Sequence, residues 1–188
     1  MKNSVVYRED IHEARLALGY RTFGANDPRR YAASILDALV GHGMSSRLFQ
    51  ELREKRGLSY DIASRMHFFT DAGMFVISAG INPAKTDLAL KTIEAELKKL
   101  CVKPVSKAEL KRTKDFMLGN FRLHQEKLTA KMFFYGQLHL AFGRLVLPQE
   151  QIEGIRKVTA EDLQAVAKTI FKPANRSVNW VLPKESKK

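Results

Sequence analysis

The sequence predicts an α+β domain whose largely antiparallel sheet is covered on one face by helices. At least two strand patterns precede a long helical stretch, and one strand pattern follows it near the C-terminal end. Strands and helices do not alternate regularly, as a parallel sheet would require. Because no repeat, low-complexity tract or long linker interrupts the chain, we expect residues 1–188 to form a single domain, with 184–188 as a disordered tail.

The composition is that of an ordinary soluble globular protein, with 45% hydrophobic and 28% charged residues. No run approaches the roughly 18 apolar residues that a membrane span needs, and the opening MKNSVVYRED has no apolar signal core. Cys101, the single cysteine, cannot form an internal disulfide and is expected to be a small hydrophobe. The compartment stays open between the bacterial cytoplasm, the bacterial periplasm and the mitochondrial matrix.

The net charge of +12, from 32 Lys and Arg against 20 Asp and Glu, raises the question of nucleic-acid binding. The basic residues of 107–131 are mixed with acidic residues, however, as on a solvated helix face. We therefore favour a generic basic surface that attracts acidic partners over a nucleic-acid site.

The first half of the chain reads as a strand, two helices and a hairpin. Apolar and polar residues alternate over 14–23, which predicts a half-buried strand. Asn26 or Asp27 before Pro28 predicts a helix that begins at Pro28 and ends at Gly41. The apolar face of that helix is expected to be Tyr31, Ile35, Leu36 and Leu39.

The stretch 41–60, GHGMSSRLFQELREKRGLSY, reads as loop, helix, loop and strand. Ser45 or Ser46 could cap the helix, and Gly57 could end it in the left-handed conformation. Tyr60 then opens the next strand. The helix would carry to one edge the basic side chains of Arg47, Arg53, Lys55 and Arg56.

The strand from Ser59 to Phe68 turns at 70–73 into a second strand, MFVISAG, which predicts a hairpin. Asn82 and Pro83 then cap a further helix. The buried side of this helix is expected to be Leu88, Leu90, Ile93, Leu97 and Leu100.

The second half is helical until its last strand, RSVNWVL. A capping box at Ser106 and Glu109 starts a long helix from Lys107 to about His124. The next helix, 128–142, is so rich in aromatic residues and methionine that we expect it to be deeply buried, with packing favoured over a ligand pocket. A short helix follows Pro148. Thr159 and Asp162 form a second capping box, before a helix that buries Leu163, Val166, Ala167 and Ile170.

The histidines do not have the spacing of a metal site, which needs two of them at i,i+4 on a helix or joined with a nearby carboxylate or thiol. His12 and Glu13 are a lone pair of residues on the approach to a strand. Ser45 and Ser46 lack a base at motif spacing, and the GHG loop fits no phosphate-binding motif. We therefore predict no catalytic residue and no metal ligand in this chain. The histidines considered are His12, His42, His67, His124 and His139.

Four segments, in order, resemble the C-terminal, non-catalytic domain of the pitrilysin or insulysin family of zinc peptidases, in the branch of the mitochondrial processing peptidases. The resemblance covers nearly the whole chain and implies helices on one side of the sheet. The segments are GANDPRRYAASILDALVGHG, SSRLFQELREKRGLSY, FFTDAGMFVISAG and VTAEDLQAVAKTI.

The active domain of that family carries H-x-x-E-H on its first long helix, with a further glutamate downstream. No such motif occurs here, so the resemblance implies that this chain holds no cofactor and is inactive alone. Zinc would belong to an N-terminal zinc-binding domain in the same or another chain. The equivalent positions here are Ala32, Ala33, Ser34, Asp37 and Ala38.

The resemblance also marks Arg53 and Tyr60 as substrate-binding residues. In larger family members, an arginine and a tyrosine seven residues later hydrogen-bond substrate carbonyl groups near the zinc. A guanidinium fork and a phenol suit this role because both donate well to a carbonyl oxygen. The structural alternative is that Arg53 pairs with Glu54 or Gln50 and that Tyr60 packs in the sheet.

The expected function is therefore the substrate-binding, chamber-closing half of a zinc metalloendopeptidase that acts on extended peptides or unfolded proteins. A non-catalytic assembly or scaffold member, like the core subunits of respiratory complex III, is the first alternative. A basic nucleic-acid-binding module is the second. The expected assembly is open between a homodimer and a heterodimer.

Overall fold

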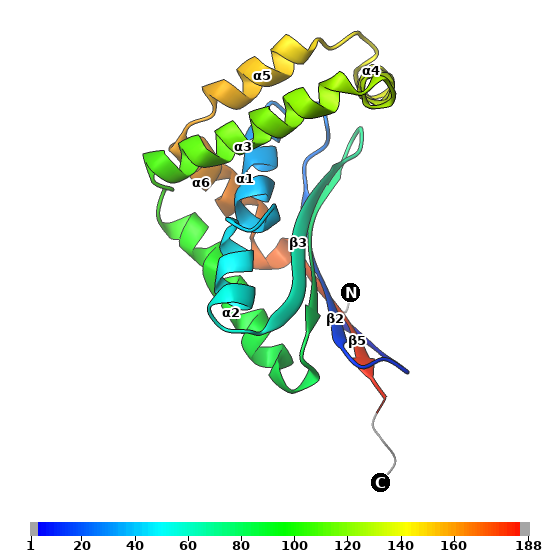
Figure 1. Cartoon of the computed structure of the whole chain (residues 1–188), viewed down its shortest axis with the longest axis vertical. Helices are drawn as coiled ribbons and strands as arrows, with labels where there is room; N and C mark the ends of the chain where they lie inside the picture. Colours follow the sequence, from blue (N-terminus) through cyan, green and yellow to red (C-terminus); the bar gives the residue numbers. More distant parts are fainter. Residues whose placement is uncertain (1–3, 185–188) are drawn as a thin grey trace.

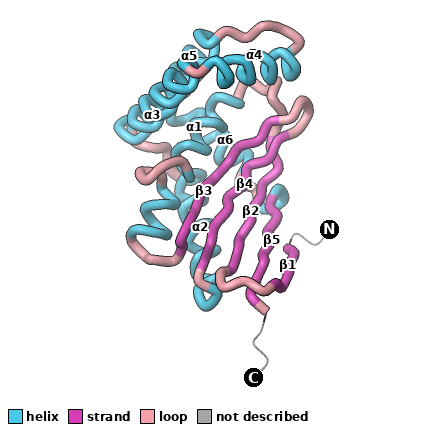
Figure 2. The backbone as a smooth tube through the Cα atoms, turned by 45° about the vertical axis from the view of Figure 1, so that its right-hand side comes forward, coloured by secondary structure: helices cyan, strands magenta, loops and turns pink. Residues whose placement is uncertain are grey.

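A computed structural model describes residues 4–184, and Figures 1 and 2 show a twisted sheet with helices on one of its faces. The 184–188 tail predicted from sequence falls outside this range except for its first residue. The strands are β1 (Ser4–Glu9), β2 (Ala14–Thr22), β3 (Ser59–Phe68), β4 (Gly73–Ile81) and β5 (Arg176–Pro183). The α-helices are α1 (Arg30–Gly41), α2 (Thr86–Val102), α3 (Lys107–Glu126), α4 (Leu128–Phe142), α5 (Pro148–Lys157) and α6 (Ala160–Ile170). Within 4–184, no helix is both long and apolar enough to cross a membrane.

The five strands lie in the order β1-β5-β2-β4-β3. Only the β1–β5 pair is parallel, and the other three pairs are antiparallel. This arrangement confirms the predicted α+β class. Strand β1 was missed, because its residues, SVVYRE, do not alternate between apolar and polar as a half-buried strand does, and all six are exposed.

The core lies between the sheet and helices α1, α2 and α6. Alternate residues of the two central strands point into it, as the period of two predicts. The inward residues of the strands are Ala14, Leu16, Leu18, Tyr20, Phe75, Ile77, Ala79 and Ile81. Facing them are Ile35, Leu36, Ile93, Leu97, Leu163, Val166 and Ile170.

The first helix begins at Arg30, two residues later than the sequence predicts. Asp27 does not cap it. Its carboxylate instead accepts the backbone N–H of Arg29 at 2.9 Å and pairs with the Arg29 guanidinium at 2.6 Å, which holds a turn before the helix. The pKa of Asp27 is lowered mainly by that hydrogen bond from Arg29.

The helix predicted between the glycine loop and β3 is a π-helix, η1 (Phe49–Glu54), in which the Lys55 N–H donates to the Gln50 carbonyl at 3.0 Å. Neither serine caps it, because the Ser46 hydroxyl donates backwards to the Gly43 carbonyl at 2.8 Å. Gly57 does adopt the left-handed conformation, with φ of 56°. Wide turns of this kind often occur at functional sites.

The hairpin is confirmed, but the helix after it differs from the prediction. Asn82 caps only a single 3-10 turn, where its side-chain oxygen accepts the Ala84 N–H at 3.0 Å, and α2 begins at Thr86. Leu88 is 50% exposed rather than buried. Ala89, the next residue, faces the core instead and is fully buried.

The two capping boxes differ from each other. At Thr159 and Asp162 both reciprocal hydrogen bonds form, at 3.1 and 2.8 Å. Ser106 accepts the Glu109 N–H at 3.1 Å, but the Glu109 carboxylate binds Arg47 and leaves that box half formed.

The prediction that α4 is deeply buried is wrong, since none of its residues is buried. One side of α4 packs on α3, where Phe134 meets Phe121 edge to face with ring centroids 5.4 Å apart. The opposite side is exposed. The apolar composition of α4 therefore led to a wrong prediction, because only one face of this helix packs against another part of the described chain.

Candidate functional site

The two predicted site residues flank the turn that leads from η1 into the edge strand β3. Arg53 is exposed, and its guanidinium lies over the Phe49 ring, 5.0 Å from the centroid. Within residues 4–184, neither Glu54 nor Gln50 binds it, so the structural alternative for Arg53 is not what the structure contains. Its planar fork of N–H donors faces solvent.

Arg53 differs in this respect from the other basic residues of the segment. Arg47 forms two 2.8 Å hydrogen bonds with Glu109, and Lys55 lies 2.5 Å from Glu51. Arg56 lies 3.6 Å from the other Glu51 oxygen. Among the described residues, Arg53 is thus the member of the group without a carboxylate partner.

Tyr60 is 58% exposed and lies where the pairing of β3 with β4 shifts register, between Ser59 and Asp61. The Ser59 hydroxyl fixes this irregularity by donating to the carbonyls of Asp61 and Gly80, at 2.6 and 3.1 Å. A bulge of this kind re-aims a side chain. The phenol makes no hydrogen bond within residues 4–184, and the exposure of the residue shows that its ring is not buried against the sheet.

The edge of β3 beyond Tyr60 is held by α1 through Asp37, which is 5% exposed. The Asp37 carboxylate accepts from the Ser64 hydroxyl at 2.5 Å and from the Met66 N–H at 2.9 Å. Its second oxygen lies 3.0 Å from Nε2 of His42, which also lies 3.1 Å from the Ser64 carbonyl oxygen. The hydrogen bond with Asp37 is the main cause that raises the pKa of His42.

The residues of α1 therefore do not fit a zinc ion. Asp37 is the one carboxylate on the helix, and its oxygens are occupied by donors from β3 and His42. No group of three or more His, Cys, Asp or Glu in the described chain is arranged to bind a metal.

The Arg47–Glu109 pair fixes the start of η1 against α3. Both side chains are largely buried, with 23% and 19% exposure. The pKa of Glu109 is lowered mainly by the hydrogen bond from Arg47. This pair spans 62 positions in the sequence, so no local pattern could have predicted it.

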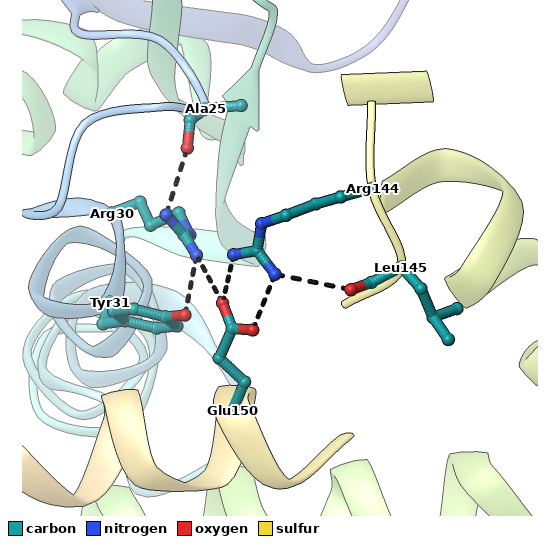
Figure 3. Close-up of polar contacts among 6 residues, drawn as sticks. All are labelled: Ala25, Arg30, Tyr31, Arg144, Leu145 and Glu150. Carbon is teal, nitrogen blue, oxygen red and sulfur yellow. Dashed lines mark hydrogen bonds and ion pairs between the residues drawn. The ribbon is translucent and has the colours of Figure 1, made fainter. Parts of the chain in front are cut away.

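A second polar cluster, not predicted from the sequence, joins α1 to α5 (Figure 3). Arg144 binds both Glu150 oxygens, at 2.7 and 2.9 Å, and Arg30 donates to the Tyr31 hydroxyl at 2.7 Å. The cluster borders a cavity of about 630 Å³. The Glu150 carboxylate pairs with Arg144 and lies 3.9 Å from Arg30, so the cluster links the start of α1 to α5.

A family profile described as "Peptidase M16 inactive domain" matches residues 2–117, which include Arg53 and Tyr60. An "Uncharacterized zinc protease" of Rickettsia felis is 35% identical over 164 residues, covering 87% of this chain and 40% of that protein. The chain thus spans well under half the length of this relative.

Two solved structures have the same fold. A protease from Helicobacter pylori is 26% identical, with a TM-score of 0.88 over 96% of this chain and 44% of that chain. A putative zinc protease from Bordetella pertussis Tohama I is 22% identical, with a TM-score of 0.79 over 94% of this chain and 97% of that chain. The fold can therefore form part of a longer chain or nearly all of a shorter one.

Proposed function

The chain belongs to the family of peptidase M16 inactive domains, and from this membership we propose that it is the substrate-binding half of a zinc metalloendopeptidase. In this role it closes the chamber and holds an extended peptide or unfolded segment against the catalytic half. The catalytic half supplies the zinc, its ligands and the general base, because α1 here offers one carboxylate whose oxygens are already occupied.

The observation that carries the proposal is the pair of unused donors at Arg53 and Tyr60. A structural arginine beside three ion-paired neighbours would be expected to find a carboxylate too, yet Arg53 has none among the described residues. Tyr60 is turned outward by a fixed irregularity of the strand instead of packing its ring. Both side chains suit carbonyl oxygens of a peptide backbone.

The chemical contribution of such donors is electrostatic. The oxygen of a peptide carbonyl gains negative charge as it is attacked, so a donor aimed at it binds the transition state better than the substrate. Arg53 can also orient a neighbouring carbonyl through its planar fork. These residues hold and polarise the substrate, and proton transfer belongs to the catalytic half.

Reconstitution tests this division of labour. The chain alone is expected to cut no peptide, and the zinc-binding half alone is expected to be poorly active. Mixing the two should restore turnover of an extended peptide. If the zinc-binding half alone turns over the same peptide at the rate of the mixture, this chain has no part in substrate binding.

A further inference from the structure

Helix α3 carries a groove in which basic side chains far outnumber acidic ones. The groove has a volume of about 520 Å³ and runs along α3 beside the end of α5 (Figure 1). We call it the α3 groove. Its charged residues are Lys107, Lys111, Lys114, Arg122 and Arg156, against the single carboxylate of Asp115.

The fold separates charges that the sequence mixes. The four basic residues that α3 contributes recur at intervals of three, four or eight positions, so they share one face of the helix. Glu109 is held by Arg47 outside the groove, and Asp115 pairs with Lys111 at 2.6 Å. The charges of 107–131 therefore do not form an evenly mixed face, because the cations collect in the α3 groove.

Three of these cations have no partner of their own. Among residues 4–184, the side chains of Lys107, Arg122 and Arg156 make no hydrogen bond or ion pair, and all three are exposed. Arg156 is fixed beside the groove, because Lys114 donates to its carbonyl oxygen at 2.7 Å and also to that of Val158. The cavity between α1, α5 and α6 differs, since four basic residues face three acidic ones there.

The floor of the α3 groove is apolar and partly bare. Leu110 and Leu118 line it, and Leu118 is 8% exposed. Gly119 lies beside them, and a Cβ at this position would meet nothing within 4 Å. Glycine lowers the stability of a helix interior, and no packing within the described chain requires it at this position. It leaves room for a second backbone to approach α3 closely.

We infer that the α3 groove binds an acidic, extended segment of the peptide substrate, an inference that rests on the proposed function. Carboxylates complement the unpaired cations, and the bare backbone at Gly119 admits another chain. From Lys107 to Arg122 the groove spans about 22 Å, the length of roughly seven extended residues. Every second side chain of such a segment is about 7 Å from the last, close to the rise of about 6 Å between helix positions four apart.

The position of the groove favours a substrate segment over an unrelated acidic partner. The Arg47–Glu109 pair holds the start of η1 against the first turn of α3. Lys107, at one end of the groove, belongs to the same turn. The groove therefore begins at the part of α3 that contacts the segment carrying Arg53.

The lining argues against nucleic acid as the occupant. No aromatic side chain is among the residues that line the groove, so a base would find no ring to stack on. The Asp115 carboxylate would also face the phosphate groups. The apolar floor suits the carbon atoms of a peptide better than a phosphodiester backbone.

Fluorescence anisotropy of a short labelled peptide of alternating Glu and Val, titrated with this chain, tests the inference. The double variant Arg122→Glu, Arg156→Glu should weaken binding at least about tenfold. Lys91→Glu, Lys168→Glu is the matched control, because these exposed residues of α2 and α6 lie outside the groove and the net charge changes equally. It should change the Kd less than about twofold. Equal losses in the two double variants would overturn the inference.

A second variant tests the shape of the groove without changing its charge. Gly119→Leu places a side chain on the bare floor and should weaken binding at least about fivefold. Gly136→Leu is its control, since a Cβ on Gly136 of α4 also meets nothing within 4 Å and Gly136 does not line the groove. A wild-type Kd in Gly119→Leu would overturn the inference. So would tighter binding of a labelled DNA oligonucleotide than of the peptide.

The complete enzyme separates this inference from the proposed function. Two peptides are compared that share a cleavage sequence, one of which carries an additional acidic segment. The acidic peptide should have the higher kcat/KM, and Arg122→Glu, Arg156→Glu should bring the ratio of the two values towards one. Tyr60→Phe should lower kcat for both peptides and keep their ratio. A wild-type ratio of one, with turnover still impaired in Tyr60→Phe, would overturn the α3 groove as a substrate site and leave the proposed function standing.

Discussion

The carboxylate of Asp37 on α1 lies 2.5 Å from the hydroxyl of Ser64 on β3. The same carboxylate accepts the Met66 N–H, so a helix side chain satisfies the outer edge of the sheet. The resemblance to the inactive domain implies that the equivalent helix of the family's active domain holds the zinc ligands. Here the helix is used to fix the edge strand that carries Tyr60.

Asp37→Ala should destabilise the protein by roughly 1–3 kcal/mol, because it leaves the buried Met66 N–H without its acceptor and the Ser64 hydroxyl with only the backbone carbonyl of residue 37, at 3.0 Å. Urea denaturation followed by circular dichroism measures the change. Asp115→Ala is the control, since Asp115 is 61% exposed and pairs only with Lys111; it should cost less than about 0.5 kcal/mol. Equal losses for both variants would mean that the buried carboxylate does not hold the edge.

The stability of the protein should fall as the pH rises from neutral, because His42 then loses the proton that stabilises the folded state. Its pKa is raised above the usual 6.5 in the folded state, chiefly by the hydrogen bond with Asp37, against the opposing effects of burial and of the charge of Arg65. Protonated His42 therefore stabilises the fold fully below pH 6.5, and this contribution is lost as the pH passes the folded-state pKa.

His42→Gln keeps a donor near Asp37 but does not titrate. The free energy of unfolding is measured between about pH 5 and 9. It should fall less with rising pH in His42→Gln than in the wild type. Parallel curves for the two proteins would contradict the assignment to His42.

Ser106→Ala and Glu109→Ala, at the two ends of the half-formed capping box, should lower the stability of the protein by different amounts. Ser106→Ala removes only the cap of α3 and should cost about 1 kcal/mol. Glu109→Ala leaves the largely buried Arg47 without its carboxylate and should cost more, roughly 2 kcal/mol. Denaturant midpoints in the reverse order would show that Glu109 acts at the helix end rather than on Arg47.

How much the sequence reveals depends on how local each signal is. The strand alternation of 14–23 and the hairpin 59–81 were predicted correctly, because their patterns lie within a few residues. The π-helix was not, since six residues are too few for a period of 3.6 to be told from a wider turn. The contact of Asp37 with Ser64 spans 27 positions and has no pattern at all.

The candidate site likewise has features that the sequence indicates and features that only the structure shows. Arg53 and Tyr60 were predicted as site residues through a family resemblance, and only the fold shows that neither side chain has a polar partner among the described residues. The aromatic content of α4 predicted burial, because composition reports how apolar a helix is and not whether a neighbour covers it. Its exposed face has meaning only once the packing of α3 is known.

This chain should hold no stoichiometric zinc, because Asp37 is the one carboxylate on α1 and its oxygens are occupied. Elemental analysis of the purified chain after exhaustive dialysis measures the metal content. One zinc ion retained per chain would contradict the assignment of the metal to the partner half.

Turnover by the complete enzyme carrying Tyr60→Phe tests the central claim most directly. The variant removes one donor and keeps the ring, so kcat should fall about tenfold to a thousandfold, with a smaller change in KM. Tyr7→Phe is the matched control, because Tyr7 is 61% exposed on β1, and Arg56→Lys is a second, because Arg56 is beside Glu51; neither should change kcat appreciably. A wild-type kcat in Tyr60→Phe, with an unchanged circular dichroism spectrum, would contradict the account and leave Tyr60 without a role in catalysis.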